Sequence, residues 1–308
     1  MIVQLTNFLI LTQLSLIVHG ESFNPEKHRN WRLLPAKDKC GLAGQQRIIG
    51  GYIVQLGAFP WIARIGFDMG EGRGRLSYNC GGSLISKYYV VTAAHCAVIP
   101  SIISSVRLGE HDANSDPDCS PDHRQCAPPV QDIRVVKVIS HEHFSGEPNM
   151  RNDIALLRLE RPPRLNAYVQ PICLPYGPGM TRTHDKDDTI VAGWGLTEKK
   201  IPSHILLGVN QLVYDRYLCT AIYERNGISI DTNKGQLCVG GKVGKDSCNG
   251  DSGGPLMWMG SFDRSISART YLLGIVSLGP STCGMLRIPG VYTRTSYFLR
   301  WILDNMQE

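Results

Sequence analysis

The sequence predicts an all-β fold that ends in an α-helix. Short runs rich in Val, Ile and Leu alternate with turns of Gly, Pro, Asn and Asp, a pattern typical of antiparallel sheets with many short strands. The clearest of these runs are residues 84–91, 133–139, 189–192 and 271–276. The helix is expected at residues 296–306, where apolar side chains recur at helical spacing. These side chains are Phe298, Trp301, Ile302 and Met306.

The composition fits a folded, globular protein. The chain has 308 residues, 43% hydrophobic and 19% charged, enough for a sizeable core in one or two domains. The formal net charge of +5 is modest for this length, and no cluster of basic residues stands out. We therefore expect neither nucleic acid nor a membrane as a partner.

The N-terminus has the features of a secretion signal. Residues 8–18 are largely apolar, and Val18-His19-Gly20 offers small residues where a signal peptidase would cut. This stretch is too short to span a bilayer, and no later segment is long and apolar enough to do so. The ten cysteines, an even number, suit an oxidising compartment. We expect a secreted, extracellular protein.

Residues 21–47 differ from the rest of the chain. They are polar, include Pro25 and Pro35, and hold one cysteine, so they can hardly fold alone. The chain thus divides into a signal peptide at 1–20, a propeptide or light chain at 21–47 and a folded domain at 48–308.

Three short motifs carry the chemistry. Ser252 lies in Gly-Asp-Ser-Gly-Gly-Pro, which can form a tight turn with backbone N–H groups beside the hydroxyl. His95 lies in Thr-Ala-Ala-His-Cys and offers a base to activate such a serine. Asp153 lies in Asn-Asp-Ile-Ala-Leu-Leu. Taken singly, the aspartate could cap a turn and the histidine could belong to the surface or the core.

In this order and within these motifs, the three residues resemble the chymotrypsin/trypsin family of serine endopeptidases. The resemblance covers residues 48–308 and implies two six-stranded antiparallel β-barrels, with the C-terminal helix after them and the catalytic residues in the cleft between them. It assigns Ser252 as nucleophile, His95 as general base and Asp153 as the carboxylate that orients His95. The N–H groups of Gly250 and Ser252 would form the oxyanion hole.

The resemblance also implies a pairing for the ten cysteines, which spacing alone does not fix. The three bridges common in the family would be Cys80–Cys96, Cys219–Cys238 and Cys248–Cys283. We expect the remaining cysteines to pair as Cys40–Cys173 and Cys119–Cys126. Free buried cysteines are the alternative.

Residues 47–51 read Arg-Ile-Ile-Gly-Gly and resemble the family's activation site. Cleavage after Arg47 would free the Ile48 amine, which would turn inward and pair with Asp251. Such a buried ion pair can order the loops around the nucleophile. The bridge from Cys40 would keep the light chain attached. Alternatively, Arg47 is a linker residue before a strand.

The specificity pocket is expected around Asp246, which matches the position at the pocket base in trypsin-like relatives. A carboxylate there selects Arg or Lys side chains; a solvated loop aspartate is the alternative. Leu278 departs from most relatives, which carry Trp there. The residues expected to line the pocket and adjoining subsites are Asp246, Ser247, Ser277, Leu278, Gly279 and Gly290.

Residues 32–35 read Arg-Leu-Leu-Pro ahead of Cys40 and resemble the linker before the protease domain in arthropod clip-domain haemolymph proteases. The clip domain, which needs six cysteines, is absent from residues 21–47. The insertion between Cys119 and Cys126 also resembles that branch. Nearby, an acidic loop could bind calcium through Glu110, although a solvated acidic loop is the favoured interpretation. The loop's acidic residues are Glu110, Asp112, Asp116, Asp118 and Asp122.

These features favour a secreted zymogen that cleaves after Arg or Lys in an extracellular cascade such as innate immunity, melanisation or Toll signalling. No cofactor is required, and calcium is the one candidate. The expected partners are a zymogen substrate, an upstream activating protease and a serpin-type inhibitor, and the enzyme is expected to be a monomer. A digestive or venom trypsin is one alternative, and a non-catalytic binding protein on a protease scaffold is another.

Overall fold

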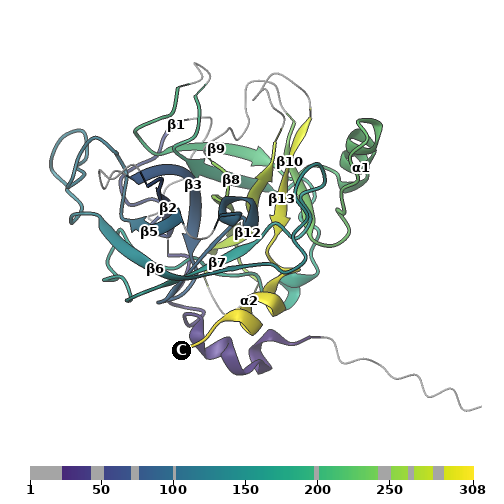
Figure 1. The fold of residues 1–308 in the computed structure, drawn as a ribbon, viewed down its shortest axis with the longest axis horizontal. Helices are drawn as coiled ribbons and strands as arrows, with labels where there is room; N and C mark the ends of the chain where they lie inside the picture. Colours follow the sequence, from purple (N-terminus) through teal and green to yellow (C-terminus); the bar gives the residue numbers. More distant parts are fainter. Residues whose placement is uncertain are drawn as a thin grey trace, which may run out of the picture.

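The computed structural model describes residues 23–42, 52–70, 76–99, 102–197, 201–241, 251–262, 267–279 and 288–308. Two antiparallel sheets form the framework of the described part of the chain (Figure 1). No helix in these ranges is long and apolar enough to cross a membrane.

The first sheet closes into a six-stranded barrel, in the order β2-β3-β4-β7-β6-β5. Its strands carry fully buried side chains, including Ile65, Leu84 and Leu156. The strands are β2 (Ile62–Asp68), β3 (Leu76–Leu84), β4 (Tyr89–Thr92), β5 (Ile103–Leu108), β6 (Gln131–Ser140) and β7 (Ala155–Leu159).

The second sheet has the order β1-β9-β8-β11-β12-β13-β10. The six strands from β8 to β13 come close to forming a ring: the residues just after β9 approach β10 through a bridge between Val213 and Val239 and a hydrogen bond from Tyr214 N to Cys238 O (2.8 Å). The two-residue strand β1 pairs with β9 outside this ring. The two six-stranded barrels expected from the sequence are thereby confirmed. The strands are β1 (Tyr52–Ile53), β8 (Asp188–Gly193), β9 (Leu207–Leu212), β10 (Gln236–Gly240), β11 (Pro255–Gly260), β12 (Arg269–Leu278) and β13 (Pro289–Arg294).

Three of the expected strands lie where the sequence placed them, but the run 84–91 does not form one strand. β3 ends at Leu84 and β4 begins at Tyr89, and the chain turns between them with Ile85 N donating to Tyr89 O (3.0 Å). Both strands are apolar because both are buried in the barrel, and only the polar pair Ser86 and Lys87 marks the turn between them.

The helices also differ in part from expectation. The C-terminal helix α2 is shorter than residues 296–306 and covers Leu299–Asn305, although Phe298, Ile302 and Met306 are buried as its spacing predicts. The helix α1 (Arg216–Arg225) was not predicted. Asp215 caps it by accepting from Tyr217 N and Leu218 N (both 3.0 Å), which is the signal that was missed.

The N-terminal segment 23–42 contains the short 3₁₀ helices η1 (Pro25–Lys27) and η2 (Arg29–Leu33) and lies against α2 (Figure 1). Asn30 Nδ2 donates to Leu303 O (2.8 Å) and Met306 O (2.9 Å), which satisfies carbonyls at the end of that helix. Cys40 is joined to Cys173. The segment thus obtains its order from the main domain.

Candidate active site

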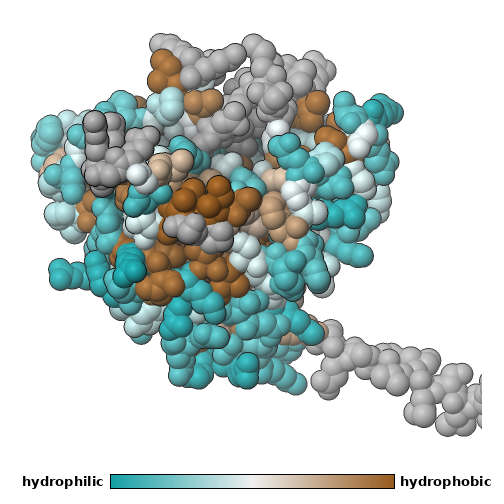
Figure 2. Space-filling view, in the orientation of Figure 1, coloured by the Kyte–Doolittle hydropathy of each residue, from teal (hydrophilic) through white to brown (hydrophobic). Residues whose placement is uncertain are grey.

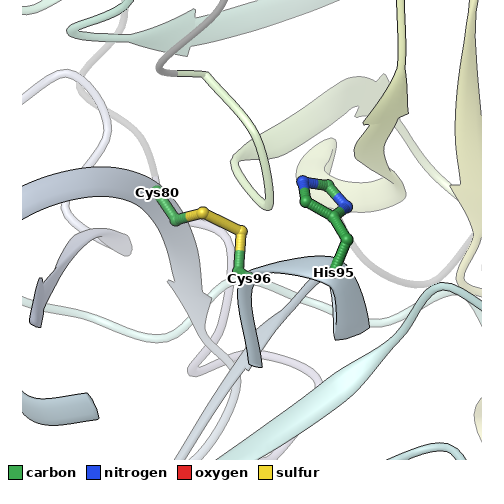
Figure 3. A group of neighbouring side chains, drawn as sticks. All are labelled: Cys80, His95 and Cys96. Atoms are coloured by element: carbon green, nitrogen blue, oxygen red, sulfur yellow. A yellow bond between two sulfur atoms is a disulfide. The ribbon is translucent and has the colours of Figure 1, made fainter. Parts of the chain in front are cut away.

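His95 lies in a 3₁₀ turn, η3 (Ala94–Ala97), directly after the buried strand β4. The disulfide Cys80–Cys96 ties this turn to β3. Figure 3 shows the imidazole standing beside the disulfide. The three side chains are close enough to hold a metal ion, but both sulfur atoms belong to the disulfide and are not available as thiolate ligands.

Asp153 lies just before β7 and is fully buried, with 0% of its surface exposed. Its Oδ2 is 2.7 Å from His95 Nδ1, and its Oδ1 accepts from the His95 backbone N–H (2.8 Å). A carboxylate only accepts hydrogen bonds, so Nδ1 of the neutral ring carries the proton and Nε2 is left with a free lone pair. Nε2 is the atom that a general base needs.

The second barrel supplies further donors to Asp153. Ser277 Oγ donates to Asp153 Oδ2 (2.5 Å), and Thr293 Oγ1 donates to the Asp153 carbonyl (2.7 Å). The register between β12 and β13 shifts between Val276 and Leu278, so Ser277 sits in a β-bulge that re-aims its side chain. Ser277 was expected to line a substrate subsite, and the structure places its hydroxyl on Asp153. The contribution of Thr293 was missed, since no local motif signals it.

Ser252 lies on a turn that packs closely against the first barrel. Its carbonyl accepts from Gly81 N (2.8 Å), and Gly253 has φ +75°. A Cβ atom at Gly253 would lie 2.2 Å from Thr92 Oγ1 and 2.6 Å from Gly81 O. The turn therefore needs glycine for both its backbone conformation and its packing. These contacts bring Ser252 next to the strand that leads into His95.

Among the described residues, no hydrogen bond joins Ser252 Oγ to His95. In proteins without substrate such a bond is often long, and it tightens in the complex. The structure thus shows the His95–Asp153 pair and the Ser252 turn beside strands of the same barrel, without a direct bond between them in the described part of the chain. The His95 side chain remains 22% exposed.

Asp251 precedes the serine, and its carboxylate lies against the loop after β8. Asp251 Oδ1 accepts from Gly195 N (3.0 Å). A Cβ atom would approach this carboxylate to 2.2 Å if built at Gly193 and to 2.6 Å if built at Gly195. Two glycines thus allow the carboxylate to approach the backbone. Its expected partner, the amine of Ile48, lies outside the described residues.

The remaining substrate-binding candidates are only partly described. Leu278 is half-buried at the end of β12, Gly279 is exposed directly after it, and Gly290 is buried in β13 opposite Val239. Several expected residues lie outside the described ranges. They are Arg47, Ile48, Asp246, Ser247, Gly250, Cys248 and Cys283.

Four disulfides join described cysteines, each in the pairing that the resemblance implies. They are Cys40–Cys173, Cys80–Cys96, Cys119–Cys126 and Cys219–Cys238.

The surroundings of Glu110 do not suit calcium. Its buried carboxylate lies 3.3 Å from Arg107 Nη1 and 3.9 Å from Arg64 Nη1, and it accepts from His111 N (3.0 Å). Burial and the neighbouring Asp118 raise the pKa of Glu110, while the two arginines oppose this shift. Two guanidinium cations beside a carboxylate repel a metal cation, so the residues present do not fit a calcium ion.

The prediction of a solvated acidic loop is also wrong for two of the loop's five acidic residues. Glu110 and Asp118 are both buried. Asp118 accepts from His111 N (2.7 Å) and Ser115 Oγ (2.7 Å). The backbone folds over these carboxylates and uses them to satisfy its own donors.

We predict that Gly253→Ala severely destabilises the protein. The left-handed backbone costs alanine about 1–2 kcal/mol, and overpacking against Thr92 and Gly81 adds about 1–3 kcal/mol. Urea unfolding measures the difference. The matched control is Gly227→Ala, because Gly227 has the same φ of +75° with nothing within 4 Å of an added Cβ. Equal losses in the two variants would contradict the packing argument.

We predict that calcium does not stabilise this protein. If the native state bound calcium, a calcium concentration about 100 times the dissociation constant would raise the free energy of unfolding by about 2.7 kcal/mol. The thermal unfolding midpoint should instead be the same with millimolar calcium and with chelator. A calcium-dependent rise in this midpoint that is abolished by Glu110→Gln would show instead that calcium binds at Glu110.

Comparison with known proteins agrees with this geometry. Residues 48–302 match the family model described as Trypsin. The chain is 40% identical over 297 residues to the CLIP domain-containing serine protease HP8 of Bombyx mori, covering 94% of this chain and 76% of that protein. It is 41% identical over 278 residues to phenoloxidase-activating factor 3 of Holotrichia diomphalia, covering 89% and 76%. The crystal structure of the Drosophila Grass clip serine protease of the Toll pathway superposes with a TM-score of 0.75 at 35% identity, covering 88% of this chain and 75% of that one. With the fold, the His95–Asp153 pair and the Ser252 turn in place, the chain belongs to the trypsin family of serine proteases, among relatives that carry clip domains.

Proposed function

We propose that this protein is the secreted zymogen of an endopeptidase that cleaves peptide bonds after Arg or Lys. The observation that carries the proposal is the buried Asp153 carboxylate, held by donors from both barrels and bonded to Nδ1 of His95. This arrangement fixes the ring so that Nε2 is free to accept a proton. The Ser252 turn packs against Gly81 of the same barrel that carries His95.

The reaction follows from these positions. Ser252 Oγ attacks the scissile carbonyl carbon while His95 Nε2 takes the hydroxyl proton, and the carbonyl oxygen gains negative charge. Asp153 stabilises the imidazolium that results. His95 then returns the proton to the leaving amine, and a water molecule repeats the sequence to release the acid. The N–H groups of Gly250 and Ser252 are proposed to bind the oxyanion.

Specificity is assigned to Asp246 at the base of the primary pocket. A cationic side chain entering that pocket meets a carboxylate, whereas an apolar one leaves the charge buried without a partner. Gly290 supports this assignment. It is buried in β13, and the resemblance places it in the pocket wall, where a residue without a side chain would leave room for a long substrate side chain.

Activation is proposed to occur by cleavage after Arg47. The Ile48 ammonium would then pair with Asp251, whose carboxylate already accepts from Gly195 N in the loop after β8. The Cys40–Cys173 bridge would keep residues 21–47 bound as a light chain. The contacts of Asn30 with α2 support this, because they hold the segment in place independently of the cleaved bond.

We propose that the enzyme acts outside the cell in a proteolytic cascade, with another zymogen as substrate, an upstream protease as activator and a serpin-type inhibitor. Two similarities support this. One relative is a phenoloxidase-activating factor, and one solved structure belongs to a protease of the Toll pathway. A tethered light chain also suits a regulated protease better than a digestive one.

The proposed specificity predicts that the activated enzyme hydrolyses Arg and Lys amides and largely ignores Phe and Leu amides. Arg should be preferred over Lys if its planar fork reaches Asp246. The measurement is kcat/KM on the four matched substrates. Asp246→Ser should lose most Arg activity and gain little on Phe. Ser252→Ala is the background control, with turnover lower by on the order of 10⁶-fold. A wild-type preference for Phe or Leu would refute the assigned pocket.

The proposed activation predicts that Arg47→Gln stays inactive under conditions that activate the wild type. N-terminal sequencing of the active wild-type enzyme should begin at Ile48, and the light chain should separate only on a reducing gel. The matched control is Arg32→Gln, which removes an exposed arginine of the same segment and should activate normally. Full activity in uncleaved Arg47→Gln would rule out this activation site.

A further inference from the structure

The loop that carries Asp153 has an unusual backbone. Met150 and Asn152 have φ of +46° and +56°, a left-handed conformation that costs most residues free energy. Part of the loop is held from within its own barrel: Asn152 Nδ2 donates to His143 O (2.8 Å), and Met150 N donates to Gly146 O (3.1 Å). Residues 145–148, just before these positions, are exposed. Ser145 N also donates to Arg151 O (3.0 Å), but no donor from the loop itself, among the described residues, reaches the side that bears the carbonyls of Asn149 and Met150.

The second barrel supports that side through Gln236, the first residue of β10, which is only 2% exposed. Gln236 Nε2 donates to Asn149 O (2.9 Å) and to Met150 O (3.2 Å). Its Oε1 accepts from Asp231 N (2.8 Å). The two carbonyls and the one N–H allow only one orientation of the amide, so its hydrogen bonds are fully specified.

The strand register places Gln236 beside a second donor to the same loop. Gln236 pairs with Thr293 of β13, and Thr293 Oγ1 donates to the Asp153 carbonyl. These two adjacent side chains therefore hold the carbonyls of Asn149, Met150 and Asp153. We call these five residues the loop clasp.

The base of the clasp is itself fixed. Arg294, next to Thr293, donates from Nη2 to Thr232 O (3.0 Å), and its backbone N donates to Gly235 O (2.9 Å). Burial of this guanidinium lowers the pKa of Arg294. The turn before Gln236 thus has little freedom to follow the loop if the loop moves.

We propose that Gln236 is a positioning residue for catalysis: through the loop clasp, the second barrel sets the backbone that aims Asp153 at His95. Gln236 does not touch the substrate or the reacting atoms. It acts by fixing two carbonyls that precede the catalytic carboxylate, and the inference rests on the peptidase activity proposed above.

The central test is Gln236→Met, which keeps the side chain's length and burial but removes both Nε2 hydrogen bonds to the loop and the Oε1 acceptor for Asp231 N. We expect kcat on an Arg amide to fall by about ten- to a hundred-fold, because misplacement of a reacting group by about 1 Å can cost that much. KM should not change, since substrate contacts are intact. Rates are normalised to titrated active sites well below the unfolding temperature, so that loss of folded protein does not count as loss of kcat.

The matched control is Gln211→Met. Gln211 is also a buried glutamine of the second barrel, in β9, and its Nε2 has no hydrogen-bond partner among the described residues. Its replacement should leave kcat unchanged. A Gln236→Met variant with the same kcat as Gln211→Met would overturn the proposal.

A second pair of variants tests the other half of the clasp. Thr293→Ser retains the hydroxyl and should keep kcat, whereas Thr293→Val removes it and should lower kcat. In the double variant Gln236→Met/Thr293→Val the two losses should not add, because both act through one loop. Additive losses would show that the two residues act separately. If Gln236→Met does not fold, the two Thr293 variants still test the loop clasp, because an unchanged kcat in Thr293→Val would contradict it.

An activity-independent measurement separates this inference from the proposed function. Backbone hydrogen exchange in residues 145–154 of the intact, uncleaved protein should be faster in Gln236→Met than in the wild type or Gln211→Met. Unchanged exchange would refute the clasp even if kcat fell. If the wild type failed to hydrolyse Arg amides, the proposed specificity would fail while exchange still tested the clasp.

Discussion

The interaction on which the active site depends is the burial of one carboxylate where the two barrels meet. Asp153 has no exposed surface, and an isolated charge in such a place would be very costly. It is accommodated because the first barrel offers the N–H and ring of His95 and the second offers the hydroxyl of Ser277. Neither barrel alone satisfies it, so correct docking of the barrels and correct orientation of the general base are one requirement.

The same junction is closed by backbone contacts that leave no room for side chains. The Ser252 carbonyl accepts from Gly81 N, and Gly253 fits against Thr92 only because it has no Cβ. Gly193 and Gly195 likewise make room for the carboxylate of Asp251. The three distant segments that carry His95, Asp153 and Ser252 are thus brought together by close approach of main chains, which tolerates very little displacement.

A second buried carboxylate, that of Glu110, is also compensated by groups of the chain itself. An acidic loop would ordinarily be solvated or bind a metal ion, but here Glu110 is buried beside Arg64 and Arg107 and receives the N–H of His111. The positive charge that a metal would supply is already present in the chain. The acidic loop that leads to the Cys119–Cys126 bridge is therefore organised by arginines of β2 and β5 and by backbone donors.

The sequence by itself determined the fold class, the family, and the identity of His95, Asp153 and Ser252, because short motifs fix local turns and the residue types that this chemistry needs. It also gave the pairing of the four described disulfides through the resemblance. It misjudged the hairpin within residues 84–91, where only Ser86 and Lys87 interrupt the apolar run, and it overlooked α1, whose clearest signal is the aspartate cap. Tertiary structure alone decided that Ser277 serves Asp153, that Thr293 and Gln236 hold the loop of Asp153, and that Glu110 is neutralised by arginines. Each of these depends on contacts between residues far apart in the chain, set by strand register, a β-bulge and barrel docking, and no local pattern of amino acids encodes such distances.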